Sequence, residues 1–184
     1  IMDVELTWEI TPDGKIHALI TGNKNPEFPE LPRFGVRMFL NKQADRVTYY
    51  GMGPQESYCD KHQGAGHGWY RASVEEMHED YIRPQENGSH YDCDYVEVAD
   101  GQTGLAATGR AFSVNVSPYT QEELERTAHN YELTEADSTI LCLDYALNGI
   151  GSNSCGPEVA EPYRLDGENI DFRFILVPFN RERR

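Results

Sequence analysis

Carboxylate side chains gather in the middle of the sequence, in a segment from Gly51 to Gly88 that has no regular hydrophobic periodicity. The six that could do chemistry are Glu56, Glu75, Glu76, Glu79, Asp80 and Glu86. Two carboxyl groups about 5 Å apart could hydrolyse a glycosidic bond with retention, one as the nucleophile and one as the general acid. The spacing selects no pair from these six. Because carboxylates are seldom buried, the sequence favours a solvated acidic surface.

The same region holds side chains that zinc accepts as ligands. Cys59, His62 and His67 lie within nine residues of each other, and Cys93 comes later in the chain. Zinc binds cysteine thiolates and histidine nitrogens, mostly in tetrahedral sites. The spacing matches no zinc motif, so ordinary polar loop residues are the favoured interpretation and a zinc site is the alternative.

Aromatic residues also cluster around this segment, at Tyr49, Tyr50, Tyr58, Trp69 and Tyr70. The C–H face of a sugar can stack on such rings, while the polar edge of a tyrosine or tryptophan can still form a hydrogen bond. Aromatic residues at strand ends more often pack into the core. A sugar-binding surface is therefore the less favoured of two interpretations.

The tripeptide Pro-Gln-Glu occurs twice, once near each end of the segment, as Pro54-Gln55-Glu56 and as Pro84-Gln85-Glu86. The flanking residues differ, with Asn87 following the second copy, and no other self-similarity occurs at this spacing. We therefore reject a repeat architecture. Loops this long in a domain usually carry function or bind a partner.

Composition limits the possible partners. The chain has 184 residues and a formal net charge of −15, which disfavours binding to nucleic acid and to anionic membranes. No apolar run is long enough to span a membrane. The four scattered cysteines form no CxxC pair and favour reduced thiols. Residues 1–184 predict one domain, and because a strand-like pattern starts at Ile1 we expect further sequence before it.

Most of the chain alternates between apolar and polar residues with the period of a β-strand. Val4, Leu6, Trp8 and Ile10 alternate first, and a Thr-Pro-Asp-Gly turn then predicts a hairpin. The expected strands cover residues 4–10, 16–20, 34–40, 46–50, 91–98, 105–116, 138–147 and 170–176. The strand over 138–147 is apolar on both faces and is therefore expected to be central.

Two capping boxes predict the helical content. Ser73 with Glu76 predicts one helical turn. Thr120 with Glu123 begins a short helix within residues 119–130, with Leu124 and Ala128 on one face. Many short strands and one short helix predict an all-β fold, an antiparallel β-sandwich.

Five stretches in this order resemble one family: "LPRFGVRMFL", "ADRVTYYGMGPQESYCD", "YIRPQENGSHYDCDYVEV", "AFSVNVSPYTQEELERTAH" and "LCLDYALNGIGSNSCGP". Together they resemble the C-terminal domain, or small chain, of the β-galactosidases of glycoside hydrolase family two. The resemblance spans residues 31–179. It implies a β-supersandwich of the galactose-mutarotase-like kind.

The resemblance also implies partners and cofactors. The catalytic glutamates of the family lie in a (β/α)8 barrel, so it implies no catalytic residue in this chain. Family members bind Mg²⁺, and some bind Na⁺, in other domains, and no metal is expected here. The parent enzyme is expected to be a homo-oligomer that contacts a galactoside substrate. Its compartment stays open between cytoplasm and periplasm.

The resemblance implies roles for two sets of residues. In the family a loop of this domain places a tryptophan beside the sugar, and here Cys155 stands at that position. Asn153, Ser154 and Cys155 are therefore the expected substrate-proximal residues. The two Pro-Gln-Glu loops are expected to dock against the catalytic domains, with Asn87 included in the second loop.

These inferences predict an accessory domain of an enzyme that hydrolyses terminal β-D-galactosides such as lactose. Two alternatives stay open. One is a freestanding carbohydrate-binding module that uses Trp69 and its tyrosine neighbours. The other is an aldose epimerase of the mutarotase type, which needs a histidine and a carboxylate across one pocket. Its histidine candidates are His62, His67, His78, His90 and His129.

Overall fold

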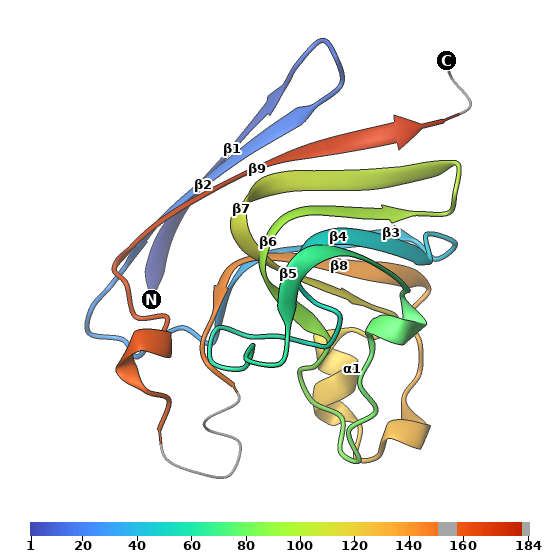
Figure 1. Cartoon of the computed structure of the whole chain (residues 1–184). Coiled ribbons are helices and arrows are strands. Elements are labelled where there is room, and N and C mark those ends of the chain that lie inside the picture. Colours follow the sequence, from blue (N-terminus) through green and yellow to red (C-terminus); the bar gives the residue numbers. More distant parts are fainter. Residues whose placement is uncertain (151–157, 182–184) are drawn as a thin grey trace.

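The computed structural model describes residues 1–150 and 158–181 of the chain (Figure 1). The strands in these residues are β1 (Met2–Ile10), β2 (Ile16–Lys24), β3 (Arg33–Asn41), β4 (Arg46–Gly53), β5 (Gly66–Ser73), β6 (Ser89–Ala99), β7 (Thr103–Ser117), β8 (Ser138–Leu147) and β9 (Asn169–Asn180). The helices are α1 (Gln121–Arg126) and the 3-10 turns η1 (Glu75–Met77), η2 (Asn130–Glu132) and η3 (Glu161–Tyr163).

All the strands belong to one antiparallel sheet that bends back on itself. Its order is β1-β2-β9-β7-β6-β4-β5, with β8 joined to β7 and β3 joined to β8. The long strand β7 pairs with β9 through residues 103–109 and with β8 through residues 113–117. Between these two stretches Ala111 has a positive φ of 52°, which few residues other than glycine adopt. The bend at this point creates two layers from one sheet.

Both layers contribute to one core. Val47, Val96 and Phe174 from one layer and Leu141 and Leu143 from the other are at most 3% exposed and belong to one cluster. Residues of β3 on the same face, such as Val36 and Met38, pack against it. The predicted antiparallel all-β fold with one short α-helix is confirmed in the described part of the chain, and β8 is central, between β3 and β7.

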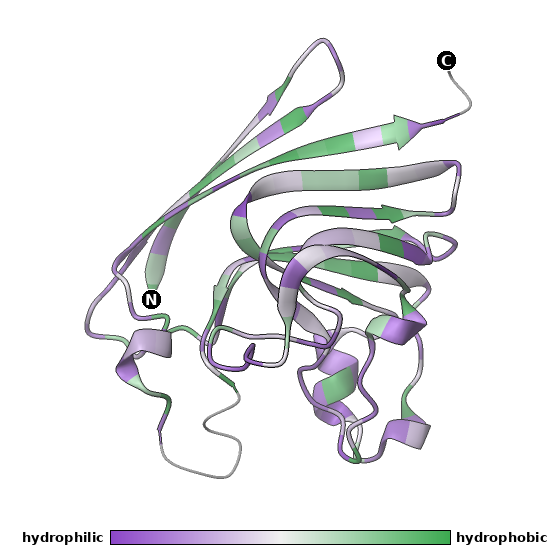
Figure 2. Cartoon of the chain, in the orientation of Figure 1, coloured by the Kyte–Doolittle hydropathy of each residue, from purple (hydrophilic) through white to green (hydrophobic). Residues whose placement is uncertain are grey.

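The core-facing side of the sheet continues beyond the second layer onto β1. In the register, Trp8 lies opposite Ala18, which lies opposite Phe174. Although these positions are on the core-facing side, no second layer among the described residues covers the side chains of β1 there. Val4, Leu6, Trp8 and Ile10 are 53%, 46%, 46% and 73% exposed. Figure 2 shows hydrophobic residues along β9, and Figure 1 shows β1 and β2 at the edge of the molecule, away from β3 and β8. We call Val4, Leu6, Trp8 and Ile10 the β1 face.

The expected strands are all present, and their ends shift by a few residues. One strand was missed: β5 (Gly66–Ser73) lies inside the segment from Gly51 to Gly88 that was predicted to be irregular. Its alternation is hidden because the outward position holds Trp69, which is 63% exposed, while the inward position holds Tyr70. Apolar residues on both sides of a strand remove the period-two signal.

The capping box at Ser73 is confirmed, whereas at Thr120 only the N-cap bond is present, because the Glu123 side chain accepts from Arg126, Thr127 and Thr134 instead. The Ser73 amide donates to Glu76 Oε2 (2.7 Å) and the Glu76 amide donates to Ser73 Oγ (3.1 Å). Thr120 Oγ1 accepts from the Glu123 amide at 3.1 Å. The helix ends at Arg126, earlier than expected, so Ala128 lies beyond it and is exposed while Leu124 is buried. The shared helical face predicted for Leu124 and Ala128 is therefore wrong.

Candidate functional site

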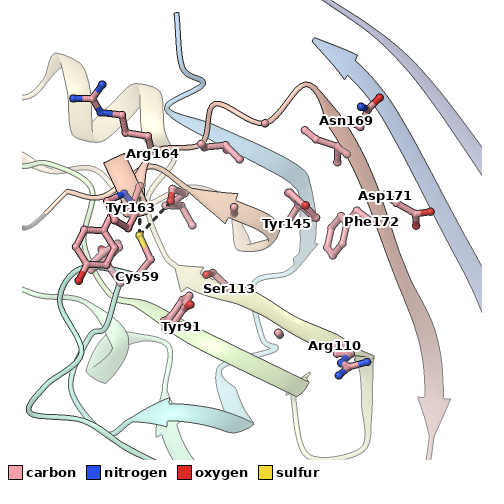
Figure 3. Close-up of a pocket in the computed structure, with 18 of the residues that line it drawn as sticks. Cys59, Tyr91, Arg110, Ser113, Tyr145, Tyr163, Arg164, Asn169, Asp171 and Phe172 are labelled. Atoms are coloured by element: carbon pink, nitrogen blue, oxygen red, sulfur yellow. Dashed lines mark hydrogen bonds between the residues drawn. The ribbon is translucent and has the colours of Figure 1, made fainter. Parts of the chain in front are cut away.

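A pocket of about 680 Å³ opens between the start of β9, the end of β8 and the bend of β7 (Figure 3). Its described lining combines aromatic rings with cationic and amide side chains. Among the lining residues are Cys59, Tyr91, Tyr145, Tyr163, Asp171 and Phe172. A mainly aromatic wall with a few polar groups is typical of a small-molecule site.

The polypeptide on both sides of residues 151–157 is fixed at this pocket. The Gly149 amide donates to the Tyr163 carbonyl (2.9 Å), and the Leu165 amide donates to Asn148 Oδ1 (3.0 Å). The Ile150 amide donates to Asp60 Oδ1 (3.2 Å). Leu147 and Tyr163 both line the pocket. The predicted substrate-proximal residues Asn153, Ser154 and Cys155 lie outside the described residues, between these two anchored ends.

The aromatic wall is held by ring contacts. Tyr145 and Phe172 meet edge to face with their centroids 6.0 Å apart, and Tyr91 stacks on His62 at 5.4 Å. Cys59 is held between two carbonyls, since its thiol donates to Leu147 O (3.6 Å) and to Tyr163 O (3.8 Å). Burial, followed by the charge of Asp60, raises the pKa of the Cys59 thiol. Cys59 is therefore a structural residue and a poor nucleophile.

The pocket holds one carboxylate among its described lining residues, Asp171. Arg173 donates to both oxygens of Asp171, at 2.7 and 2.9 Å, and this hydrogen bonding lowers the pKa of Asp171. A retaining glycosidase needs a second carboxyl group whose pKa is raised, to act as the acid. The described walls of the pocket thus do not carry that pair.

The two Pro-Gln-Glu segments lie side by side. The Ser57 amide donates to the Ser89 carbonyl at 2.7 Å, and the Tyr91 amide donates to Ser57 Oγ at 2.9 Å. Ser57, which directly follows the first tripeptide, is thus hydrogen-bonded to Ser89, which lies three residues after the second tripeptide, and to Tyr91. The two copies that the sequence separates by thirty residues form one structural unit, next to the pocket residue Tyr91.

Glu56 is the centre of this unit. Its side chain is 6% exposed and accepts hydrogen bonds from Lys61 Nζ, from the Tyr81 hydroxyl and from the Gly88 amide, the last at 2.8 Å. Burial raises the pKa of the Glu56 carboxyl, but these donors outweigh it, led by Lys61, so that the pKa is lowered. An ionised, fully engaged carboxylate fastens the second loop to the first.

Glu86 has a different environment. Its Oε2 accepts from Arg33 Nη1 at 3.0 Å, while Oε1 is buried without a hydrogen-bond partner among the described residues. Arg33 also donates twice to Asp144, which is 2% exposed. Burial raises the pKa of Glu86 to about 6, with the charges of Asp144 and Glu56 adding to this and Arg33 opposing it. Arg33 therefore forms ion pairs with two carboxylates, Glu86 and Asp144.

The remaining residues of the predicted docking loops divide by exposure. Pro54, Gln55 and Gln85 are exposed, whereas Pro84 and Asn87 are buried. Asn87 is part of the framework, because its Oδ1 accepts from the Glu79 amide (3.0 Å) and its carbonyl accepts from Asn115 Nδ2 (2.6 Å). Docking to another domain stays a prediction for the three exposed residues.

The candidate zinc ligands do not come together. His62 Nδ1 donates to the Tyr58 carbonyl and His67 Nε2 donates to the Asp92 carbonyl, both at 2.9 Å. Cys93 is fully buried in the core, and burial raises the pKa of its thiol. Within residues 1–150 and 158–181, no three His, Cys, Asp or Glu side chains are placed to hold a metal ion. The zinc hypothesis for Cys59, His62, His67 and Cys93 is wrong.

The predicted aromatic surface is split between two faces of the sheet. Tyr49 and Tyr58 are 1% and 2% exposed and belong to the interior. Tyr70 packs against the core beside Tyr49, with ring centroids 5.4 Å apart. Tyr50 and Trp69 lie on the opposite, outer face, 5.1 Å apart. A single platform of all five rings is therefore wrong, because neighbouring residues of a strand point to opposite sides.

A pH dependence of stability follows from His90, which is 2% exposed, packs at a tilted angle against the ring of Tyr49 and donates from Nδ1 to the Met52 carbonyl (3.1 Å). Burial lowers its pKa from 6.5 to about 4, against the opposing effects of Met52 and Glu56. Its contribution to stability is present above pH 6.5 and is lost as the pH falls towards 4. We expect this histidine to lower the free energy of unfolding, measured by urea titration, by about 3 kcal/mol between pH 7 and pH 4.

A His90→Gln variant isolates this contribution, because glutamine can donate a hydrogen bond and does not titrate. Glu86, whose raised pKa has the opposite effect on the pH dependence, is present in both proteins. The variant should lose about 3 kcal/mol less between pH 7 and pH 4 than the parent chain. Equal losses in the two proteins would show that His90 is not buried as a neutral ring.

Residues 1–176 match the protein family described as "Beta galactosidase small chain". The chain belongs to the β-galactosidase small chain family. The chain is 45% identical over 177 residues to a protein from Actinobacillus pleuropneumoniae named beta-galactosidase, covering 96% of this chain and 17% of that protein. It is 40% identical over 172 residues to the beta-galactosidase of Staphylococcus xylosus, covering 93% and 17%.

A third relative, the beta-galactosidase of Kluyveromyces lactis, is 32% identical over 162 residues, covering 86% of this chain and 15% of that protein. The chain thus spans about a sixth of the length of these relatives. The family resemblance found in the sequence motifs is confirmed. No helix in the described residues is long and apolar enough to cross a membrane.

The sequence did not predict the pocket. Its aromatic wall comes from β6, β8, η3 and β9, so the residues are far apart in sequence and no local motif joins them. One signal was available: the Gly-rich stretch from Asn148 to Pro157 follows a central strand, and loops at the ends of buried strands commonly border binding sites.

Proposed function

We propose that this chain is the C-terminal accessory domain of a retaining β-galactosidase of glycoside hydrolase family two. The enzyme hydrolyses terminal β-D-galactosides such as lactose through a covalent galactosyl intermediate. Its catalytic glutamates lie in a (β/α)8 barrel outside this chain. The observation that carries the proposal is the match of residues 1–176 to the small chain family, in a chain that spans about a sixth of its relatives.

The carboxylates of the chain support an accessory role. Glu56 is held by three donors, and Glu86 and Asp144 share Arg33. In the pocket, Asp171 is paired with Arg173. Each of these groups has a structural partner, and no two of them flank a cavity in the described residues. The chain supplies position and shape to the active site, and misplaced substrate contacts cost large factors in rate.

The β1 face is where the rest of the enzyme packs. Four apolar side chains on the core-facing side of this edge strand are exposed. An exposed apolar edge strand tends to associate with other polypeptide unless another domain covers it. The remaining five-sixths or so of a β-galactosidase is the partner of suitable size. Exposed Pro54, Gln55 and Gln85 form a second, smaller contact.

The pocket is the part of this chain that approaches the galactoside. Its aromatic wall fits the C–H face of a sugar, and Gly149 and Ile150, which precede Asn153, Ser154 and Cys155 in the sequence, are hydrogen-bonded beside it. Mg²⁺, and Na⁺ where it is used, belong to other domains of the enzyme. We expect the assembled enzyme to be a homo-oligomer with the closed symmetry that most soluble oligomers adopt.

Hydrolysis of a chromogenic β-galactoside tests the proposal. The purified chain alone is expected to be inactive, and activity is expected when it is mixed with the remainder of its β-galactosidase polypeptide. Turnover by the chain alone that survives repurification would overturn the proposal. Accelerated anomer exchange of α-galactose by the chain alone would instead establish an aldose epimerase.

Two substitutions on β1 separate docking from folding. Leu6→Asp places a charge in the β1 face, whereas Thr7→Asp places the same charge on the other side of the same strand. Since Leu6 is already 46% exposed, both variants should keep the melting temperature of the parent chain. Leu6→Asp is expected to abolish reconstituted activity and Thr7→Asp to retain it. Equal activity of the two variants would exclude the β1 face as the docking surface.

A further inference from the structure

Trp69 lies on the outer face of the sheet, on the opposite side from the core and apart from the pocket. We propose that Trp69, with Tyr50 and Tyr95, forms a second saccharide-binding surface, which we call the outer platform. The indole centroid is 5.1 Å from the ring of Tyr50 and 5.4 Å from the ring of Tyr95. Although it touches two rings, Trp69 is 63% exposed.

The pairing of three strands builds this platform. Tyr50 on β4 lies opposite Trp69 on β5 and opposite Tyr95 on β6. Directly paired residues point to the same face of a sheet. Their neighbours Tyr49 and Val96 point the other way and are at most 1% exposed in the core. The platform therefore stands on a rigid, well-packed base.

The two tyrosines fix the orientation of the indole. Tyr95 meets Trp69 edge to face at an angle of 61°, and Tyr50 meets it at 43°. A ring that is already held in place loses little conformational entropy when a ligand stacks on it. An exposed but oriented tryptophan is thus suited to binding.

Polar groups surround the rings. The Tyr95 hydroxyl donates to Glu97 Oε2 (3.1 Å), and Arg181 Nη2 donates to Glu97 Oε1 (2.6 Å). On the other side, the ring of His67 meets Tyr50 edge to face at 4.7 Å. A pyranose presents a C–H face for the indole and hydroxyl groups for such polar edges.

The composition of the surface favours a small neutral saccharide over a protein. Next to the rings the same face carries polar Thr48 and Arg71, paired across β4 and β5, so the apolar area is limited to the platform. A stable protein interface needs a much larger patch. The β1 face, which is aliphatic around Trp8, has that character instead. The formal net charge of −15 disfavours an anionic ligand.

The saccharide class rests on the proposed function: for an accessory domain of a β-galactosidase, the ligand is a β-galactoside. The outer platform binds it without hydrolysing it and keeps substrate close to the enzyme. Because this binding needs no catalytic domain, its test is independent of reconstituted activity.

The chain contains two tryptophans, Trp8 and Trp69, which makes fluorescence a specific probe. In a Trp8→Phe chain, all tryptophan emission comes from Trp69. We expect methyl β-D-galactopyranoside and lactose to give a saturable shift of this emission, with a dissociation constant on the order of 1 mM. The matched Trp69→Phe chain, which reports Trp8, should show no saturable shift. In the Trp8→Phe background, Tyr50→Ala should weaken binding about tenfold because the indole loses a supporting ring.

Three results would overturn the inference. One is a linear response that the acyclic polyol mannitol reproduces. Another is an equal saturable response from Trp8 in the Trp69→Phe chain. The third is loss of acrylamide quenching of Trp69 when the Trp8→Phe chain is assembled with the rest of the enzyme, which would make the platform an interdomain contact. Saccharide binding without reconstituted activity would contradict the proposed function and leave the platform standing.

Discussion

Replacing Arg33 with methionine is expected to lower the free energy of unfolding by about 3 to 5 kcal/mol. Arg33 Nε and Nη2 donate to the two oxygens of Asp144 at 2.8 and 2.6 Å, and Nη1 donates to Glu86. Methionine has a similar volume and fills the space without the charge. It therefore leaves a carboxylate that is 2% exposed without its cation. The measurement is urea-induced unfolding at neutral pH.

The pH dependence of this loss identifies its cause. Burial raises the pKa of Asp144 even with Arg33 present, and raises that of Glu86 to about 6. Without the cation, both pKa values rise further above those of the unfolded chain. The two carboxyls then favour the folded state at low pH and oppose it as the pH increases. The stability lost by Arg33→Met should therefore be smaller at pH 5 than at pH 8.

Arg37 provides the matched control on the same strand and the same face. It forms a two-fold hydrogen-bonded pair with Glu122 at 2.8 and 2.9 Å, but the two side chains are 35% and 65% exposed. Exposed ion pairs contribute about 1 kcal/mol or less. Arg37→Met should therefore cost much less than Arg33→Met. Equal costs for the two variants would mean that Asp144 finds water or another partner when Arg33 is lost.

The sequence predicted the strands well because most of them have one apolar face. β3 shows how: Val36 and Met38 pack on the core, while Arg37 on the other face pairs with Glu122. β5 was missed because Trp69 on its outer face is as apolar as the residues on its inner face. Local hydrophobic pattern and turn chemistry thus predict elements, but they fail where an exposed aromatic residue stands in a polar position.

The partners of charged residues were beyond sequence reasoning. Arg33 and Asp144 are 111 residues apart and meet because β3 pairs with β8. Glu56 reaches the Gly88 amide across the whole segment that includes β5. Neither contact has a local signature. The repeated Pro-Gln-Glu marked two positions of interest, but the register of the sheet decides which partner each glutamate meets.

Gly88 follows the second Pro-Gln-Glu and Asn87, and Gly88→Ala is expected to lower the free energy of unfolding by about 2 to 5 kcal/mol. Gly88 has a φ of +67°, which strains any residue with a Cβ atom. That Cβ would also lie 2.0 Å from the Met77 carbonyl oxygen. Because this oxygen belongs to the backbone of η1, the loop must move. This movement withdraws the Gly88 amide from Glu56 Oε2, to which it donates at 2.8 Å. That hydrogen bond is one of those that join the two loops.

Gly14→Ala separates the two parts of this cost. Gly14 has a φ of +83°, but a Cβ there would meet nothing within 4 Å. Its substitution should therefore cost only the backbone strain, about 1 to 2 kcal/mol. The excess for Gly88→Ala, measured by urea unfolding of both variants, gives the cost of displacing the loop from Met77 and Glu56.

If the docking proposal for the exposed loop residues is also right, Gly88→Ala should reduce reconstituted β-galactosidase activity at temperatures where the variant is still folded, and Gly14→Ala should not. Equal destabilisation by the two substitutions would show instead that the contact with Met77 relaxes freely and that Glu56 does not hold the loops together.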